Sequence, residues 1–225
     1  MKKMSDITIL YYTANSENKT FEANIIKNTL SLSNGLPIIS VSQEPLEGFG
    51  KNICVGKKEN CYHNEFRQIL IGLYEIETPL VLVAEADFLY PPEYFMFVPD
   101  NYDKCYRFGN VWVHTKKLEY IYQYKQYSDG AQILGKDKWI GIIEEALSGR
   151  SEWGSKDDAP LPYFRIPTDD RYVWNSFDPA VTFKTGKGVS PVTNTKRGVE
   201  PRESLPYWGS AKRLIDEMEG NSWVR

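Results

Sequence analysis

The chain has 225 residues, 41% hydrophobic and 25% charged residues, and a formal net charge of −3. This length suits one substantial core or at most two small domains, and the balance is that of a globular rather than a disordered protein. The net negative charge excludes a general nucleic-acid coat, and no apolar run approaches the ~20 residues of a membrane span.

The first 95 residues alternate between buried strands and amphipathic helices. Residues 7–12 are β-branched and aromatic, which is typical of a strand, and they stop at a polar turn. Apolar residues then recur at helical spacing. Further elements follow in chain order: a helix at 20–32, strands at 36–41, 53–55 and 80–84, and a helix at 64–77 before the last strand. This order predicts an α/β fold with a Rossmann-type, mostly parallel sheet flanked by helices.

The second half of the chain is less regular. Residues 106–114 and 120–126 predict strands that could pair antiparallel, and an apolar face around 139–147 predicts a helix. Residues 150–209 are rich in Pro, Gly and Asp, with only 180–183 strand-like, and a short helix at 210–219 follows. We therefore expect one domain over residues 1–225, with a regular half at 1–95 and a loop-rich C-terminal half at 96–225.

Two carboxylates stand at the end of the buried strand in PLVLVAEADFLYPPEYF, residues 79–95. In open α/β sheets, ligands bind beyond the carboxyl ends of the strands. Glu85 and Asp87 are two residues apart, so their side chains point the same way. Mg²⁺ or Mn²⁺ takes oxygen ligands and completes its shell with water and substrate phosphates. A metal that holds a diphosphate is one predicted occupant, and a pair of solvated carboxylates at a strand exit is the alternative.

Two segments around these carboxylates carry a family resemblance. NEFRQILIGLYEIETPLVLVAEAD resembles the helix–strand–acidic-motif unit of the GT-A fold glycosyltransferases, and AEADFLYPPEYF is similar to a stretch in bacterial and viral members. NVWVH and YSDGAQILGK resemble their acceptor-side segments more faintly. The resemblance covers roughly residues 5–150. It implies a GT-A-like fold, a nucleotide-sugar donor such as a UDP-sugar, and a divalent metal, Mn or Mg.

The same resemblance implies roles for individual residues. The end of the first strand, Tyr11, Tyr12, Thr13 and Asn15, would lie near the nucleoside of the donor. Asp87 would bind the metal directly, and Glu85 would face both the metal and the sugar diphosphate.

A later carboxylate would deprotonate the acceptor hydroxyl if the reaction inverts. The candidates are Asp129 and Glu152, which lie in predicted loops next to aromatic residues. Asp157 and Asp158 are less specific candidates.

Two features depart from the family pattern. Relatives often carry His between the two acids, where this chain has Ala86, and many add a late His as a metal ligand. This chain has only His63 and His114, and we expect the latter to be a strand residue rather than a ligand. Either metal binding is completed by water, or Lys184 and Lys187 take the pyrophosphate charge.

The acceptor is open at this stage. Residues 181–213 contain a set of basic residues that either form a solvated tail or bind phosphates: Lys184, Lys187, Lys196, Arg197, Arg202, Lys212 and Arg213. Three functions compete. They are a glycosyltransferase with a small, lipid-linked or protein-linked acceptor, the same reaction on a hydroxymethylated base in double-stranded phage DNA, and a non-catalytic nucleotide-sugar-binding protein. A base inside a duplex would have to be flipped out to react.

Other classes of enzyme and compartment are disfavoured by the sequence. No phosphate loop, dinucleotide fingerprint or nucleophile elbow occurs. The start of the chain is not expected to be a signal peptide, because its apolar stretch is too short. The three cysteines are odd in number and lack metal-ligand spacing. We therefore expect a reduced, cytoplasmic protein, in the host cytoplasm if it is phage-encoded.

Overall fold

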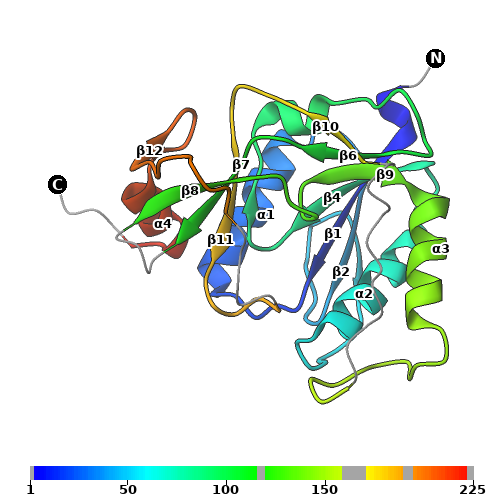
Figure 1. The fold of residues 1–225 in the computed structure, drawn as a ribbon. Coiled ribbons are helices and arrows are strands. Elements are labelled where there is room, and N and C mark those ends of the chain that lie inside the picture. Colours follow the sequence, from blue (N-terminus) through cyan, green and yellow to red (C-terminus); the bar gives the residue numbers. More distant parts are fainter. Residues whose placement is uncertain (1–2, 116–119, 159–170, 190–194, 222–225) are drawn as a thin grey trace.

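The computed structural model describes residues 3–115, 120–158, 171–189 and 195–221. Within these residues the strands form a seven-stranded sheet, a four-stranded sheet and a two-stranded pair (Figure 1). The larger sheet contains, in chain order, β1 (Ile7–Thr13), β2 (Ile38–Ser42), β3 (Lys51–Cys54), β4 (Leu80–Glu85), β6 (Cys105–Phe108), β9 (Gln132–Gly135) and β10 (Arg171–Trp174). The smaller sheet contains β5 (Phe88–Leu89), β7 (Val111–Thr115), β8 (Ile121–Gln126) and β11 (Ala180–Lys184).

The remaining elements are helices and one short pair of strands. They are α1 (Lys19–Leu32), α2 (Tyr62–Glu75), α3 (Lys136–Leu147), α4 (Ala211–Glu219), two 3₁₀ helices (Met4–Asp6 and Pro92–Met96), and β12 (Ser204–Leu205) with β13 (Gly209–Ser210). In the part of the chain that the structure describes, we find no helix long and apolar enough to cross a membrane.

The larger sheet is mostly parallel. Its strand order is β10-β6-β9-β4-β1-β2-β3; β1 pairs parallel with β2 and β4, β2 with β3, and β6 with β10. Only β9 runs antiparallel to both of its neighbours, β4 and β6. The predicted α/β class, with a mostly parallel sheet flanked by helices, is confirmed. The carboxyl ends of β1, β2 and β4 consequently lie along one edge of the sheet.

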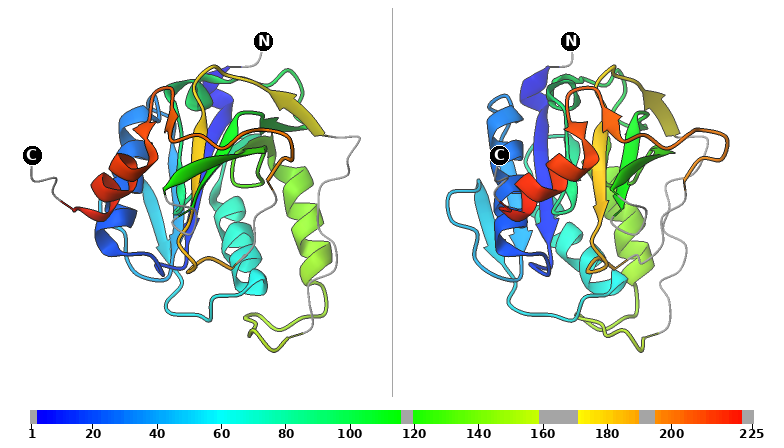
Figure 2. Two further views of the ribbon diagram at one scale, coloured as in Figure 1. Left: turned by 60° about the vertical axis from the view of Figure 1, so that its left-hand side comes forward. Right: turned by 90° about the vertical axis from the view of Figure 1, so that its left-hand side faces the viewer.

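Helices cover both faces of this sheet (Figure 2). Ile9 and Tyr11 of β1 belong to the core beneath α1, whereas Leu10 belongs to the core beneath α2 and α3, as the two-residue period of a strand requires. The side chain of Asn18 caps α1 by accepting from the Thr20 N–H at 2.9 Å. α4 packs beside α1.

The two sheets meet at the predicted acidic motif. β4 ends at Glu85, the chain turns through Ala86 and Asp87, and β5 then pairs antiparallel with β11 of the smaller sheet. The Phe183 N–H donates to the Asp87 carbonyl at 2.8 Å, which ties the turn to β11. The two carboxylates therefore stand at the junction of the sheets.

Several elements of the second half differ from the prediction. The single strand predicted at 106–114 is divided at Gly109 and Asn110 into β6 and β7, which belong to different sheets. A Cβ at Gly109 would lie 2.2 Å from the Asn175 side-chain oxygen, so this crossing point requires glycine. β9 and β10 were not predicted, and neither was β5 in the first half. The C-terminal half therefore supplies more strands than its loop-rich composition suggests.

Candidate functional site

A cavity of about 1210 Å³ opens at the carboxyl edge of the larger sheet. Its wall comes from the ends of β1 and β4, the first turn of α2, and the smaller sheet. Among the residues that line it are Tyr12, Thr13, Gln43, Glu65, Glu85, Asp87, Arg107, Lys125, Asp129, Lys184 and Lys196. The structure thus brings both carboxylates of the acidic motif to one cavity, where ligands of open α/β sheets bind.

Glu85 is held in place from several sides. The Tyr12 hydroxyl donates to its Oε1 at 2.5 Å. Its own N–H donates to the Tyr90 hydroxyl at 3.0 Å, and that hydroxyl donates to the Gly130 carbonyl at 2.6 Å. A Cβ at Gly130 would lie 2.2 Å from Glu85 Oε2, so the carboxylate packs directly against this glycine. Burial, and then the charge of Asp87, raise the pKa of Glu85 to about 7.

Asp87 faces a lysine of the smaller sheet. Lys184 Nζ lies 3.9 Å from Asp87 Oδ2, at the end of β11. Burial raises the pKa of Asp87, and the charges of Lys184 and Lys125 oppose that rise. The ion pair therefore offsets only part of the cost of burying this carboxylate.

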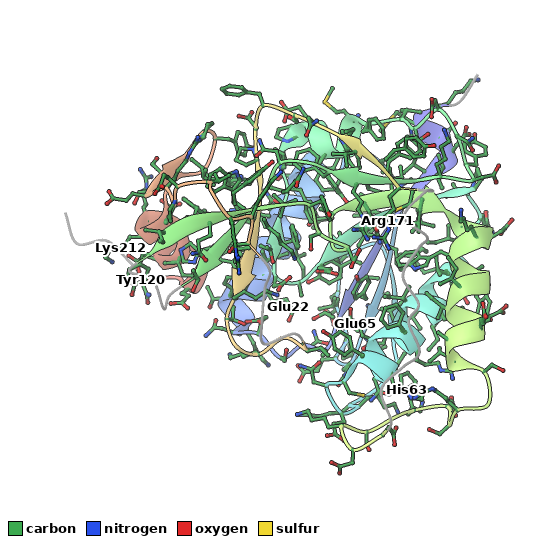
Figure 3. All side chains as sticks on the ribbon, in the orientation of Figure 1. Glu22, His63, Glu65, Tyr120, Arg171 and Lys212 are labelled. Carbon is green, nitrogen blue, oxygen red and sulfur yellow. The ribbon has the colours of Figure 1, made fainter. Side chains whose placement is uncertain are left out.

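A third carboxylate, Glu65, faces the same space from the first turn of α2 (Figure 3). Burial, and then the charges of Glu85 and Asp87, raise its pKa to about 8. The sequence contained only a weak signal for Glu65, an acidic residue in the first turn of a helix. Three carboxylates with raised pKa values make a site that favours a cation or a proton.

The residues predicted to lie near the nucleoside are divided between the cavity and the core. Tyr12 and Thr13 line the cavity. Tyr11 is fully buried in the core, where its hydroxyl donates to Glu22 Oε1 at 3.3 Å. The Thr13 hydroxyl donates to the same Glu22 oxygen at 2.6 Å. Tyr11 therefore stabilises the end of β1 from the core side of the sheet and does not line the cavity.

Asn15 also has a bracing contact. It takes a positive φ of 48°, and its Oδ1 accepts from the backbone N–H groups of Gln43 and Glu44 at 2.8 Å each. These bonds join the turn after β1 to the end of β2. The side-chain oxygen of Asn15 is thereby committed to backbone partners.

The two candidate bases lie in different places. Asp129 lines the cavity and forms an ion pair and hydrogen bond with Arg107, which is 5% exposed. The Arg107 guanidinium also lies 5.3 Å from the centre of the Tyr127 ring. Glu152 is exposed and does not line this cavity, and its carbonyl accepts from Arg67 Nε at 2.8 Å. The structure therefore brings Asp129, but not Glu152, to the site.

The less specific candidates are also separated. Asp158 lines the cavity 3.9 Å from His63 Nδ1, whereas Asp157 is exposed outside it. His114 lies in β7, as the strand prediction for this residue requires; it is 1% exposed, and its Nε2 is 2.9 Å from the Ala211 carbonyl oxygen.

The basic residues of 181–213 differ in their surroundings. Lys184 and Lys196 line the cavity, whereas Lys187 is exposed outside it. The Lys187 carbonyl accepts from Asn60 Nδ2 at 2.7 Å and from the Ser16 hydroxyl at 3.4 Å, and its N–H donates to the Thr185 hydroxyl at 3.2 Å. Arg197 is exposed, Arg202 lies over the Trp112 ring, Lys212 pairs with Asp216, and Arg213 pairs with Glu217. Carboxylates on α4 therefore neutralise part of the positive charge of this segment.

The fit to a divalent metal rests on two carboxylates. Among the described residues, no group of three or more His, Cys, Asp or Glu side chains is arranged to hold a metal ion. Glu85 and Asp87 could supply two ligands. A Mg²⁺ or Mn²⁺ ion takes its other ligands from water and substrate phosphates. Burial raises the pKa of both groups, and a cation bound between them would favour their ionised forms.

No family model matches the chain, and no curated protein matches it. Similar solved structures include a glycosyltransferase involved in the glycosylation of the major capsid of PBCV-1. It is 15% identical, with a TM-score of 0.45, and the match covers 78% of this chain and 92% of that one. The inositol-1-phosphate CTP transferase from T. maritima is 11% identical, with a TM-score of 0.48, and the match covers 86% of this chain and 94% of that one.

A third similar structure, S. aureus TarS 1–349 in complex with UDP-GlcNAc, is 9% identical at a TM-score of 0.37, and the match covers 78% of this chain and 59% of that one. At these identities and TM-scores the similarity decides neither substrate nor mechanism. The function has to be inferred from the site itself.

Proposed function

We propose that this protein is a glycosyltransferase that moves a sugar from a nucleotide-diphosphate sugar to an acceptor hydroxyl. One observation carries the proposal: Glu85, Asp87 and Lys184 meet at the carboxyl edge of a Rossmann-type sheet, in a cavity of about 1210 Å³. Ligand pockets of roughly 300–1,000 Å³ hold drug-sized molecules, so this cavity can hold a nucleotide sugar together with part of an acceptor.

Most of the donor half of the cavity would come from residues 1–95, and Lys184 of β11 would join it from the second half. Tyr12 and Thr13 would contact the nucleoside, for which we favour a UDP-sugar, while Tyr11 and Asn15 hold the end of β1 in position. Asp87, with Glu85, would hold Mn²⁺ or Mg²⁺, and such an ion supplies positive charge to the diphosphate when it is bound. Lys184 contributes a second positive charge to the same group.

The acceptor half lies within residues 96–225 of what we treat as one domain. Asp129 would accept the proton of the acceptor hydroxyl in an inverting reaction, with Arg107 fixing its position. The neighbouring Tyr127 ring, 42% exposed, offers a face on which an acceptor sugar can stack. Glu152 is no longer our candidate for the base, because it lies outside the cavity.

The distribution of basic residues favours a small or glycan acceptor over duplex DNA. A DNA-binding surface needs several phosphate contacts on one face, whereas Lys212 and Arg213 are paired on α4 and Arg202 lies over Trp112.

We place the reaction in the cytoplasm, with the three unpaired cysteines as support.

The test is release of nucleoside diphosphate from a panel of nucleotide sugars in the presence of Mn²⁺, with free monosaccharides and disaccharides as acceptors. Wild-type protein should release nucleoside diphosphate from at least one donor, and Glu85→Gln should lower turnover by about 100-fold or more. Glu75→Gln, a substitution of an exposed glutamate on α2, is the matched control and should retain full activity. A donor that binds but is never turned over with any acceptor or water would point instead to a non-catalytic nucleotide-sugar-binding protein.

A further inference from the structure

A second lysine, not foreseen from the sequence, faces the acidic motif. Lys125 of β8 is half-buried, lines the cavity, and donates from Nζ to the Ser128 hydroxyl at 2.8 Å. Its charge lowers the pKa of both Glu85 and Asp87, as that of Lys184 does. The two ammonium groups therefore act on the same pair of carboxylates from two strands of the smaller sheet.

The backbone gives Lys125 a special position. β8 pairs with β7 so that Trp112 lies opposite Tyr124 and Val111 lies opposite Gln126, and the register skips Lys125 between them. This extra residue is a β-bulge, and Gln126 after it has a φ of 81°. Bulges occur next to active sites, where they redirect a side chain.

The bulge is fixed by a neighbouring segment. The Lys196 N–H donates to the Tyr124 carbonyl at 2.8 Å, and its Nζ donates to Gln126 Oε1 at 3.0 Å. Both residues that flank Lys125 are thus bonded to the same partner. This arrangement holds the Lys125 backbone in place. The backbone, and not only the side-chain conformation, therefore directs the Lys125 ammonium group into the cavity.

Lys125 and Lys184 bring two ammonium groups into the same cavity, among the carboxylates of the acidic motif. Burial, and then the charge of Lys184, lower the pKa of Lys125, whereas the charges of Glu85, Asp87 and Asp129 raise it. The two ammonium groups therefore repel each other in a partly desolvated space, and the carboxylates offset part of that repulsion. Asp129 is already engaged by Arg107. A doubly charged anion that contacts both lysines relieves their repulsion, and oxygens of a diphosphate span more than one such group.

We propose that Lys125 and Lys184 together bind the diphosphate of the donor. This inference rests on the proposed function and adds to it a two-lysine site for the leaving group. During transfer the bond from the anomeric carbon to the diphosphate oxygen breaks and its electron pair stays on that oxygen. The acceptor oxygen bonds to the anomeric carbon and its proton passes to Asp129. The two lysines neutralise the charge that grows on the departing diphosphate.

The experiment is calorimetric titration of inorganic pyrophosphate and of UDP into the full chain, with EDTA and then with Mn²⁺. In EDTA the wild type should bind both ligands, and Lys125→Gln and Lys184→Gln should each weaken binding by about 10- to 100-fold, the loss expected for one charge-assisted contact. Lys125→Arg should retain most of the affinity. Lys51→Gln, a substitution of an exposed lysine paired with Glu75, is the matched control and should bind as the wild type does.

The outcomes separate this inference from the proposed function. Pyrophosphate or UDP binding that is equal in wild type and Lys125→Gln, with both folded as judged by circular dichroism, overturns the two-lysine site even if transfer activity is present. Wild-type binding only in Mn²⁺, unaffected by either substitution, overturns it as well. Lysine-dependent binding of UDP by a protein that never transfers a sugar supports the site and removes the proposed function.

Discussion

Glu65→Gln tests whether the cavity really concentrates negative charge. The pKa of Glu65 is raised from 4.5 to about 8 in the folded protein, first by burial and then by the charges of Glu85 and Asp87. Between these two values the unfolded chain loses the proton while the folded protein keeps it. The free energy of unfolding therefore falls as pH rises through this interval, and the whole penalty is present above pH 8.

The size of the effect follows from the difference of about 3.5 between the two pKa values. At 1.36 kcal/mol per pH unit, the penalty reaches at most about 5 kcal/mol. Glu65 is only half-buried, so we expect about half of that. Glutamine cannot ionise and escapes the penalty. Relative to wild type, Glu65→Gln should therefore gain about 2 kcal/mol of stability between pH 5 and pH 9.

The assay is urea unfolding of both proteins, without added metal or nucleotide, at pH 5, 7 and 9, analysed by linear extrapolation. Glu75→Gln is the control, because Glu75 is exposed at the other end of the same helix and its effect should vary little with pH. A stability difference between Glu65→Gln and wild type that stays constant from pH 5 to pH 9 would refute the view that Glu65 faces a buried, negatively charged cluster.

Three further substitutions test the close contacts. Gly130→Ala should displace the Glu85 carboxylate, because the new Cβ would lie 2.2 Å from Glu85 Oε2. Turnover should fall by about 100-fold with little change in melting temperature. Full activity in the variant would argue against the placement of Glu85. Gly72→Ala should destabilise by about 1–3 kcal/mol in urea unfolding, since its Cβ would lie 2.4 Å from Leu10 Cδ1. Gly141→Ala is the control, because a Cβ at Gly141 in α3 would meet nothing within 4 Å, and this variant should gain roughly 0.5–1 kcal/mol of stability. Equal effects on stability at Gly72 and Gly141 would contradict the packing of α2 on β1.

The first half of the fold was predictable because its signals are local. β1, α1, α2 and β4 each carry a pattern of apolar residues that a short window of sequence contains, and their predicted limits lie close to the observed ones. The smaller sheet and most of the second half depend on pairing between distant segments. β5 has two residues and exists because β11 lies beside it, and the division of 106–114 at Gly109 follows from packing against Asn175. A short window of sequence around β5 does not contain β11, and one around Gly109 does not contain Asn175.

The site divides in the same way. Glu85, Asp87 and Tyr12 could be predicted to face the cavity because they stand at strand ends, where a topological rule places ligands. Lys125 was missed because its position depends on a bulge, which is a property of the pairing of β7 with β8 and not of the residue. Arg107 was missed because it lies inside a strand segment with no local mark of its use.

The measurement that tests the central claim most directly is a thermal-shift comparison of wild type and Asp87→Asn with a panel of UDP-, GDP- and TDP-sugars, each with and without Mn²⁺. A ligand at 100 times its Kd stabilises the native state by about 2.7 kcal/mol. At roughly 2–4 °C per kcal/mol for a chain of this size, the melting temperature should rise by about 5–11 °C. We predict such a shift for at least one nucleotide sugar with the wild type, and its loss in a folded Asp87→Asn variant. Equal shifts in the two proteins, or no shift with any nucleotide sugar, would contradict a nucleotide-sugar site at the end of β4.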